Sequence, residues 1–150
     1  MKFRIASLFV FLAIAMCSCH SHEDSPTIKE AVEVHKNMRA LYSDLESIAI
    51  AKKEEVKGHL KEAEMNADTL SAEKLASLNA ELEKLHQDLA TWKENLVEVP
   101  GHCFHEEGEP HEHHHHAHLE GLTDEEMLKL QQELEQQLKD IEQSIKSVGK

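Results

Sequence analysis

The chain has 150 residues, a formal net charge of −13 and only 4% aromatic residues. This length allows one small domain, and the acidity argues against a nucleic-acid partner, because phosphates require a basic surface. Glycine and proline are scarce, at 5 and 3 residues, which favours long helices over a β-sandwich or a barrel. Three cysteines cannot build a disulfide framework, and the unusual number is the 13 histidines.

Residues 1–18 have the pattern of a secretory signal peptide. Lys2 and Arg4 precede an apolar run of 12 residues, 5–16. This run is too short to cross a bilayer as a helix, which takes about 20 residues, and it fits the apolar region of a cleaved signal. We therefore expect the protein to be exported.

The pair Ser18-Cys19 follows this run and resembles the lipobox of bacterial lipoproteins, in which the cysteine is diacylated and becomes the mature N-terminus. We expect acylated Cys19 to hold the chain on a lipid bilayer, because several acyl chains anchor a soluble domain stably. No aspartate follows Cys19, which favours the outer membrane, with residues 19–25 as a polar tether. Cys17 is the alternative acylation site, and an ordinary cleaved signal is the alternative to a lipoprotein.

A first helix is expected from Thr27 to Asn66. Ser25 can cap it, and Pro26 suits its first turn. One face carries residues spaced three and four apart, which is typical of a helix that packs on a core: Ala31, Val34, His35, Met38, Leu41, Tyr42, Leu45, Ile48 and Ala49. His35 on this face is expected to be a core residue, whereas His59 is expected to be solvated, as is His86 further along the chain.

A second helix is expected after a turn at residues 66–69, with Ser71 as its cap. Its leucines and one tryptophan alternate three and four apart, the pattern of a coiled-coil seam: Leu75, Leu78, Leu82, Leu85, Leu89, Trp92 and Leu96. Trp92 is expected to fill a seam position in the core. The helix should stop at Val99-Pro100-Gly101.

A third helix is expected after Thr123, which can form a capping box with Glu126. With three helical patterns, the sequence predicts an all-α protein. Short turns favour antiparallel neighbours. Residues 26–150 would form an antiparallel three-helix bundle or coiled coil, with a long histidine-rich loop, 98–122, between the second and third helices. Because the first helix is longer than the second, Val56 to Ala63 should be poorly covered.

Eight histidines and one cysteine lie within the 17 residues 102–118: His102, Cys103, His105, His111, His113, His114, His115, His116 and His118. Imidazole is a ligand suited to zinc, copper and nickel, and a thiolate favours zinc or Cu(I). In an extended or a helical backbone, three or four of these side chains share one side. We therefore expect transition-metal binding by a flexible loop, which resembles in composition the histidine-rich loops of bacterial zinc-uptake receptors, zinc transporters and nickel chaperones.

Two other interpretations remain open. The loop can be solvated filler in a structural or interaction protein, whose seams would bind a helical partner or a second copy. Cys103 can instead pair with Cys103 of another chain in an oxidising compartment. Catalysis is not expected, because the sequence has no glycine-rich phosphate-binding loop, no nucleophile elbow and no firm scaffold for a hydrolytic zinc site.

Four stretches carry a family resemblance: the lipobox ending in Ser18-Cys19, VHKNMRALYSDLESI at 34–48, the leucine heptads leading to DLATWKENL at 88–96, and LTDEEML at 122–128. With them the mature chain resembles small bacterial lipoproteins often labelled "viral A-type inclusion protein". That label reflects coiled-coil similarity and carries no activity. The resemblance therefore implies the lipid anchor at Cys19 and no other functional residue.

Overall fold

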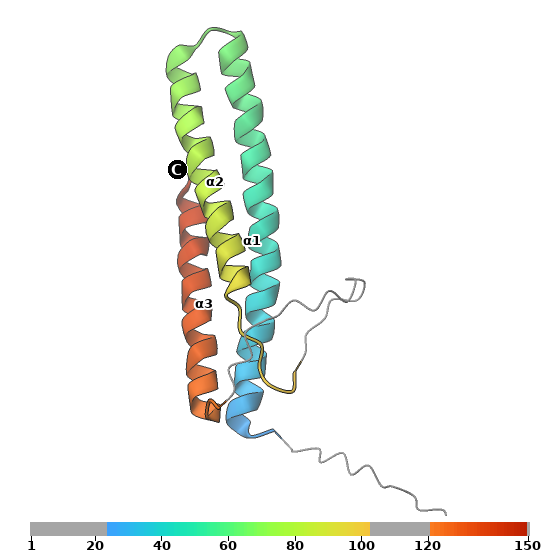
Figure 1. The fold of residues 1–150 in the computed structure, drawn as a ribbon. Helices are drawn as coiled ribbons and strands as arrows, with labels where there is room; N and C mark the ends of the chain where they lie inside the picture. Colours follow the sequence, from blue (N-terminus) through green and yellow to red (C-terminus); the bar gives the residue numbers. More distant parts are fainter. Residues whose placement is uncertain (1–23, 103–120, 150) are drawn as a thin grey trace, which may run out of the picture.

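The computed structural model describes residues 24–102 and 121–149. These residues form three helices and no strand: α1 (Pro26–Met65), α2 (Thr69–Glu94) and α3 (Asp124–Ser147) (Figure 1). The prediction of an all-α protein is confirmed at this level. The predicted signal peptide and Cys19 lie outside the described residues. None of the described helices is long and apolar enough to cross a membrane.

Helix α1 begins as the sequence predicts. The Ser25 hydroxyl accepts a hydrogen bond from the Ile28 amide at 3.1 Å, and Pro26 lies in the first turn, where no amide donor is needed. The helix continues without interruption for 40 residues. Its buried face contains Met38 and Leu45, and His35 lies fully buried among them, as expected.

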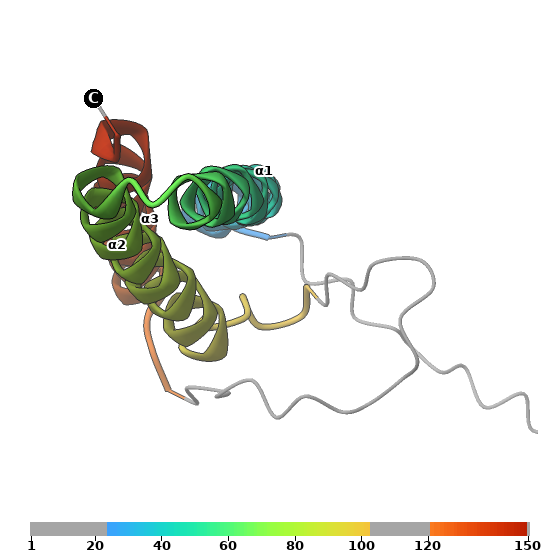
Figure 2. The ribbon, with the colours of Figure 1, turned by 90° about the horizontal axis from the view of Figure 1, so that it is seen from above.

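The chain reverses direction within residues 66–68, which join α1 to α2 (Figure 2). The Asp68 amide donates to the Ala63 carbonyl at 2.9 Å and the Ala67 amide to the Glu64 carbonyl at 3.1 Å. This pair of bonds is the Schellman motif, and Ala67 occupies its left-handed position with a φ of 53°. The turn therefore satisfies the last carbonyls of α1.

The cap of α2 differs from the prediction. Asp68, not Ser71, is the capping residue, and its carboxylate accepts a hydrogen bond from the Ser71 amide at 3.1 Å. Hydrogen bonds from the Ser71 hydroxyl and from its backbone amide hold the pKa of the Asp68 carboxyl below its usual value. The physical reason is that the Schellman turn brings Asp68 directly to the start of the helix, so α2 begins earlier than expected.

The short turn fixes the register between α1 and α2. Lys53 pairs with Glu83 at 2.8 Å, and Tyr42 stacks on Trp92 with ring centroids 5.7 Å apart. The end of α1 and the start of α2 are therefore level, and the extra length of α1 lies at its N-terminal end. The prediction of poor cover from Val56 to Ala63 is wrong, since these two residues are 9% and 8% exposed.

Residues 95–102 continue beside the N-terminal half of α1 after α2 has ended (Figure 1). Leu96, Val97 and Val99 belong to the core, although α2 stops at Glu94, before Leu96. The second helix is therefore shorter than its leucine pattern predicts, and the loop expected from residue 98 includes buried chain. The apolar side chains of these three residues are buried although the chain is no longer helical.

Helix α3 begins with the predicted capping box, in which Thr123 and Glu126 each bond the other's backbone amide. It runs parallel to α1, because Ser25 donates to Asp124 at one end and Lys52 donates to the Val148 carbonyl at the other. The indole of Trp92 donates to the Leu134 carbonyl at 2.9 Å, so this seam residue is satisfied within the core, as expected.

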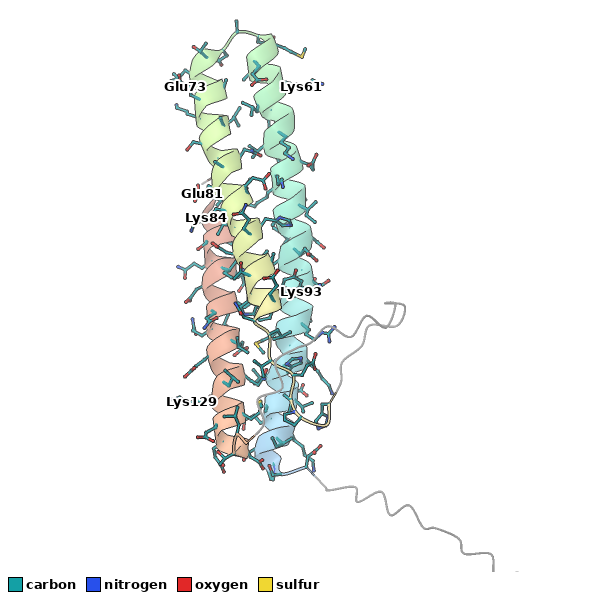
Figure 3. The ribbon with its side chains drawn as sticks, in the orientation of Figure 1. Lys61, Glu73, Glu81, Lys84, Lys93 and Lys129 are labelled. Carbon is teal, nitrogen blue, oxygen red and sulfur yellow. The ribbon has the colours of Figure 1, made fainter. Side chains whose placement is uncertain are left out.

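Helices α1 and α2 extend beyond the end of α3 (Figure 1). We call this two-helix projection, residues 53–65 and 69–77, the arm; it is about 20 Å long at 1.5 Å per residue. Met65 and Leu70 beside its turn are 75% and 63% exposed. The charged residues labelled in Figure 3 are exposed, as expected for the solvated faces of the helices: Lys61, Glu73, Glu81, Lys84, Lys93 and Lys129.

Candidate functional site

The site of interest lies where residues 95–102 leave the core toward the histidine-rich segment. The His102 amide donates to the Val99 carbonyl at 3.0 Å, with Pro100 and Gly101 between them. Gly101 has a φ of 82°, so this is the pattern of a type II turn, in which proline and then a glycine with positive φ are favoured. The turn fixes the direction in which the chain leaves the helices.

Three parts of the chain meet at this end of the protein. The His102 imidazole lies 3.0 Å from the Asp24 carboxylate, measured from Nε2 to Oδ2. The neighbouring Ser25 hydroxyl donates to Asp124 at the start of α3. Asp24 and Ser25, the beginning of the histidine-rich segment and the residues just after its end therefore lie at the same end of the helices.

A buried hydrogen-bond chain connects α1, α3 and residues 95–102. Gln131 is fully buried, and its side-chain amide donates to the Val97 carbonyl at 2.9 Å. Its carbonyl oxygen lies 3.0 Å from Nδ1 of His35, which is also fully buried. Because a carbonyl oxygen accepts and does not donate, Nδ1 of His35 must carry the proton of this bond.

The second ring nitrogen of His35 faces Glu98. Nε2 lies 3.7 Å from Oε2 of this carboxylate, a separation longer than a hydrogen bond. The Glu98 side chain is 12% exposed, and among the described residues its Oε2 has no hydrogen-bond partner. A buried imidazole nitrogen and a buried carboxylate oxygen therefore face each other.

Most of the predicted metal ligands lie outside the described residues: Cys103, His105, His111, His113, His114, His115, His116 and His118. His102 is described, and its imidazole is paired with the Asp24 carboxylate. Within residues 24–102 and 121–149, no three His, Cys, Asp or Glu side chains are grouped closely enough to hold a metal ion. The prediction for the segment as a whole stays a prediction.

Sequence reasoning missed two members of this arrangement, Gln131 and Glu98. Gln131 lies four residues after Met127 and three before Leu134, a position on the buried face of α3 that the helical period could have identified. Glu98 lies between buried Val97 and Val99, an alternation typical of extended chain. The expected loop boundary at residue 98 hid this signal.

Tyr42 is another titratable group in the described core. Burial raises the pKa of its phenol, and the hydrogen bond that it donates to Glu46 at 2.9 Å acts in the same direction. The ring stacks on Trp92, and the Lys93 ammonium lies 5.4 Å from its centre. These contacts give Tyr42 a packing role at neutral pH.

Comparison with known proteins gives no relative. The chain matches no protein-family model, no curated protein sequence and no solved structure. The candidate site must therefore be judged on its own chemistry.

Proposed function

We propose that this protein is a lipoprotein of the outer membrane, held by acylated Cys19, whose histidine-rich segment binds zinc or another divalent transition metal such as copper or nickel. Residues 26–150 would form an antiparallel three-helix bundle that carries this segment, and the protein would buffer or collect metal. One observation carries the proposal: eight imidazoles and one thiol lie within 17 consecutive residues. Such a density of donors suits several exchanging metal ions.

The surroundings of His102 support this proposal. A histidine that binds a metal through one nitrogen commonly donates its other N–H to a carboxylate, which fixes the tautomer. The Asp24 carboxylate lies 3.0 Å from Nε2 of His102 and favours the proton on that nitrogen. Nδ1 then carries the lone pair of the neutral ring. The acidic composition of the chain also raises the local concentration of cations.

Metal binding by these groups depends on pH in a defined direction. Protons and metal ions compete for the same imidazole nitrogens. Histidine has an unperturbed pKa of about 6.5, so binding should weaken as pH falls through about 6. Release in acid and capture near neutral pH fit a buffer better than a permanent structural site.

The test uses mature protein isolated from its own membranes without metal-affinity resin. We expect bound zinc, copper or nickel in the native protein. In titrations of metal-free protein, replacement of the eight histidines by glutamine and Cys103 by serine should remove most zinc binding. Native protein without metal, or unchanged zinc binding after the nine replacements, would contradict the proposal.

A second candidate function is that of an interaction protein without a metal role. The observation that favours it is the arm, which lacks cover by α3 and ends in exposed Met65 and Leu70. Sedimentation of the full chain tests it. A self-associated species that dissociates when Met65 and Leu70 are both changed to lysine supports this function, and a strict monomer argues against a second copy as the partner.

A further inference from the structure

We propose that His35 and Glu98 form a two-ligand site for a divalent transition metal inside the helical domain. The site lies next to the start of the histidine-rich segment but uses none of its donors, so it stands independently of the proposed function. Four described residues build this site: His35, Glu98, Gln131 and Val97.

The first step is the orientation of His35. The Gln131 side-chain amide is held by the Val97 carbonyl at 2.9 Å, which turns the Gln131 oxygen toward Nδ1 of His35 at 3.0 Å. This oxygen requires a proton on Nδ1, so Nε2 carries the lone pair when the ring is neutral. A histidine that ligates a metal has this same arrangement, with its other N–H donated to a fixed oxygen.

The second step is the position of Glu98. The residue that orients Gln131 is Val97, and Glu98 follows it directly, so one short piece of chain supplies both the support and the carboxylate. Oε2 of Glu98 is buried and has no hydrogen-bond partner among the described residues. A buried carboxylate oxygen is costly unless a cation or a donor compensates it.

The third step is the distance. Nε2 of His35 and Oε2 of Glu98 are 3.7 Å apart. Two ligands of one tetrahedral zinc ion, with bonds of about 2.0–2.2 Å, lie about 3.4 Å apart. A zinc ion would therefore fit between these atoms after a movement of a few tenths of an ångström.

The fourth step is access and coordination number. The Glu98 side chain is 12% exposed, so its carboxylate reaches the protein surface while His35 does not. Two protein ligands leave further positions to water, and such a site binds more weakly than a closed structural zinc site with four protein ligands. Reversible occupancy is the expected behaviour.

A proton can occupy the same gap, because protonated His35 would form an ion pair with Glu98. The two cases differ in one measurable respect. A metal site stabilises the fold when zinc is added at constant pH, since a ligand of the folded state alone raises its stability. A proton site responds to pH and is indifferent to zinc.

The experiment uses the mature chain in which the eight histidines of 102–118 are glutamine and Cys103 is serine, which we call the donor-free parent. We expect it to bind one zinc or cobalt ion per chain and to melt at a higher temperature when zinc is added. Glu98→Gln, which keeps the shape of the side chain, should weaken this binding at least about tenfold. His59→Gln is the matched control on α1, because His59 is 59% exposed, and it should bind like the parent.

The outcomes separate this inference from the proposed function. A donor-free parent that keeps its helical circular dichroism but binds no zinc up to about 1 mM overturns the inference, while zinc binding by the unmodified chain still supports the proposed function. Equal zinc affinity in Glu98→Gln and the parent also overturns the inference. A pH-dependent stability that Glu98→Gln abolishes, without any effect of zinc, assigns the gap to a proton and overturns it as well.

Discussion

Two fully buried polar residues, His35 and Gln131, lie in a core that is otherwise almost entirely apolar. They are tolerated because they bond each other and because Gln131 also bonds the Val97 carbonyl. The bonds join α1, α3 and residues 95–102, which have no hydrophobic seam pattern in common. A satisfied network of this kind specifies one arrangement of three segments more sharply than aliphatic packing alone.

Replacing Gln131 with leucine should destabilise the fold by about 2–4 kcal/mol, because the Val97 carbonyl and the N–H of His35 both lose their partner inside the core. Urea unfolding followed by circular dichroism measures the change. Gln132→Leu is the matched control, since Gln132 is exposed on the same helix and its replacement should alter stability by less than about 0.5 kcal/mol. Equal effects of the two changes would contradict a role for the network.

The sequence was informative about single residues wherever the helical period applied. It predicted buried His35 and the core position of Trp92, because both lie on regular apolar faces. It did not predict the contact between His35 and Gln131, because these residues are 96 positions apart and a spacing pattern carries no information on which side chains meet across two helices. The pairing of Glu98 with His35 escaped for the same reason.

At the scale of elements, the ends of the helices decide how the helices align. The three-residue turn at 66–68 makes the end of α1 level with the start of α2, and the register of Tyr42 with Trp92 follows from it. The apolar patterns predicted three helices correctly but not this alignment. A repeat shows which face of a helix is buried, but it does not show at which residue the helix begins or ends. Where α2 stops, Val97 and Val99 complete the core outside any helix, which a search for heptads does not detect.

Ala67→Gly should stabilise the protein by about 0.5–1 kcal/mol. Ala67 has a φ of 53°, a left-handed conformation that costs an L-residue with a β-carbon more than it costs glycine. The same replacement at Ala80, an exposed position within α2, should destabilise by about 1 kcal/mol. Thermal or urea unfolding of both variants checks the opposite signs, and a loss of stability in Ala67→Gly would argue against the turn described.

Thr123→Ala should destabilise α3 by about 1 kcal/mol at neutral pH, because it removes the side-chain half of the capping box. The hydrogen bonds between Thr123 and Glu126 hold the pKa of the Glu126 carboxyl below its usual value. A lowered folded-state pKa gives stability that is present above the unfolded-state pKa, about 4.3 for glutamate, and is lost as pH falls through the lower folded-state value. The cost of the substitution should therefore shrink in acid.

Urea unfolding at neutral pH and near pH 2 measures this difference. Thr91→Ala is a suitable control, because Thr91 is exposed within α2 and alanine is the better helix former. It should leave stability unchanged or raise it slightly at both pH values. A Thr123→Ala penalty that is independent of pH would show that the Thr123 hydroxyl does not stabilise the ionised Glu126 carboxylate.

At the scale of the whole molecule, the protein is divided along its length into two differently supported parts. Between Ser25 and Lys52, α1 has α3 alongside it, and the two pairs Ser25–Asp124 and Lys52–Val148 mark the ends of that contact. In the arm, α1 and α2 have only each other as neighbours among the helices that the structure describes. Fewer neighbours mean a lower free energy of local opening.

Native-state hydrogen exchange should resolve this division. Backbone amides of the arm, residues 53–65 and 69–77, should exchange faster than those of residues 31–49 and 127–145, by at least about tenfold. The ion pair between Lys53 and Glu83 joins α1 to α2 where the arm begins. Lys53→Met should therefore raise the hydrogen-exchange rates of the arm more than those of α3. Uniform protection along α1 would mean that the protein opens only as one unit.

The parallel course of α1 and α3 has a mechanical consequence. Tension on the chain ahead of Asp24 reaches the Ser25–Asp124 and Asp24–His102 pairs before it reaches any helix–helix seam. The same two pairs hold His102, the first residue of the histidine-rich segment, and Asp124, the first residue of α3. A pull on the chain ahead of Asp24 would therefore act first at this end of the molecule, which is the end opposite the arm.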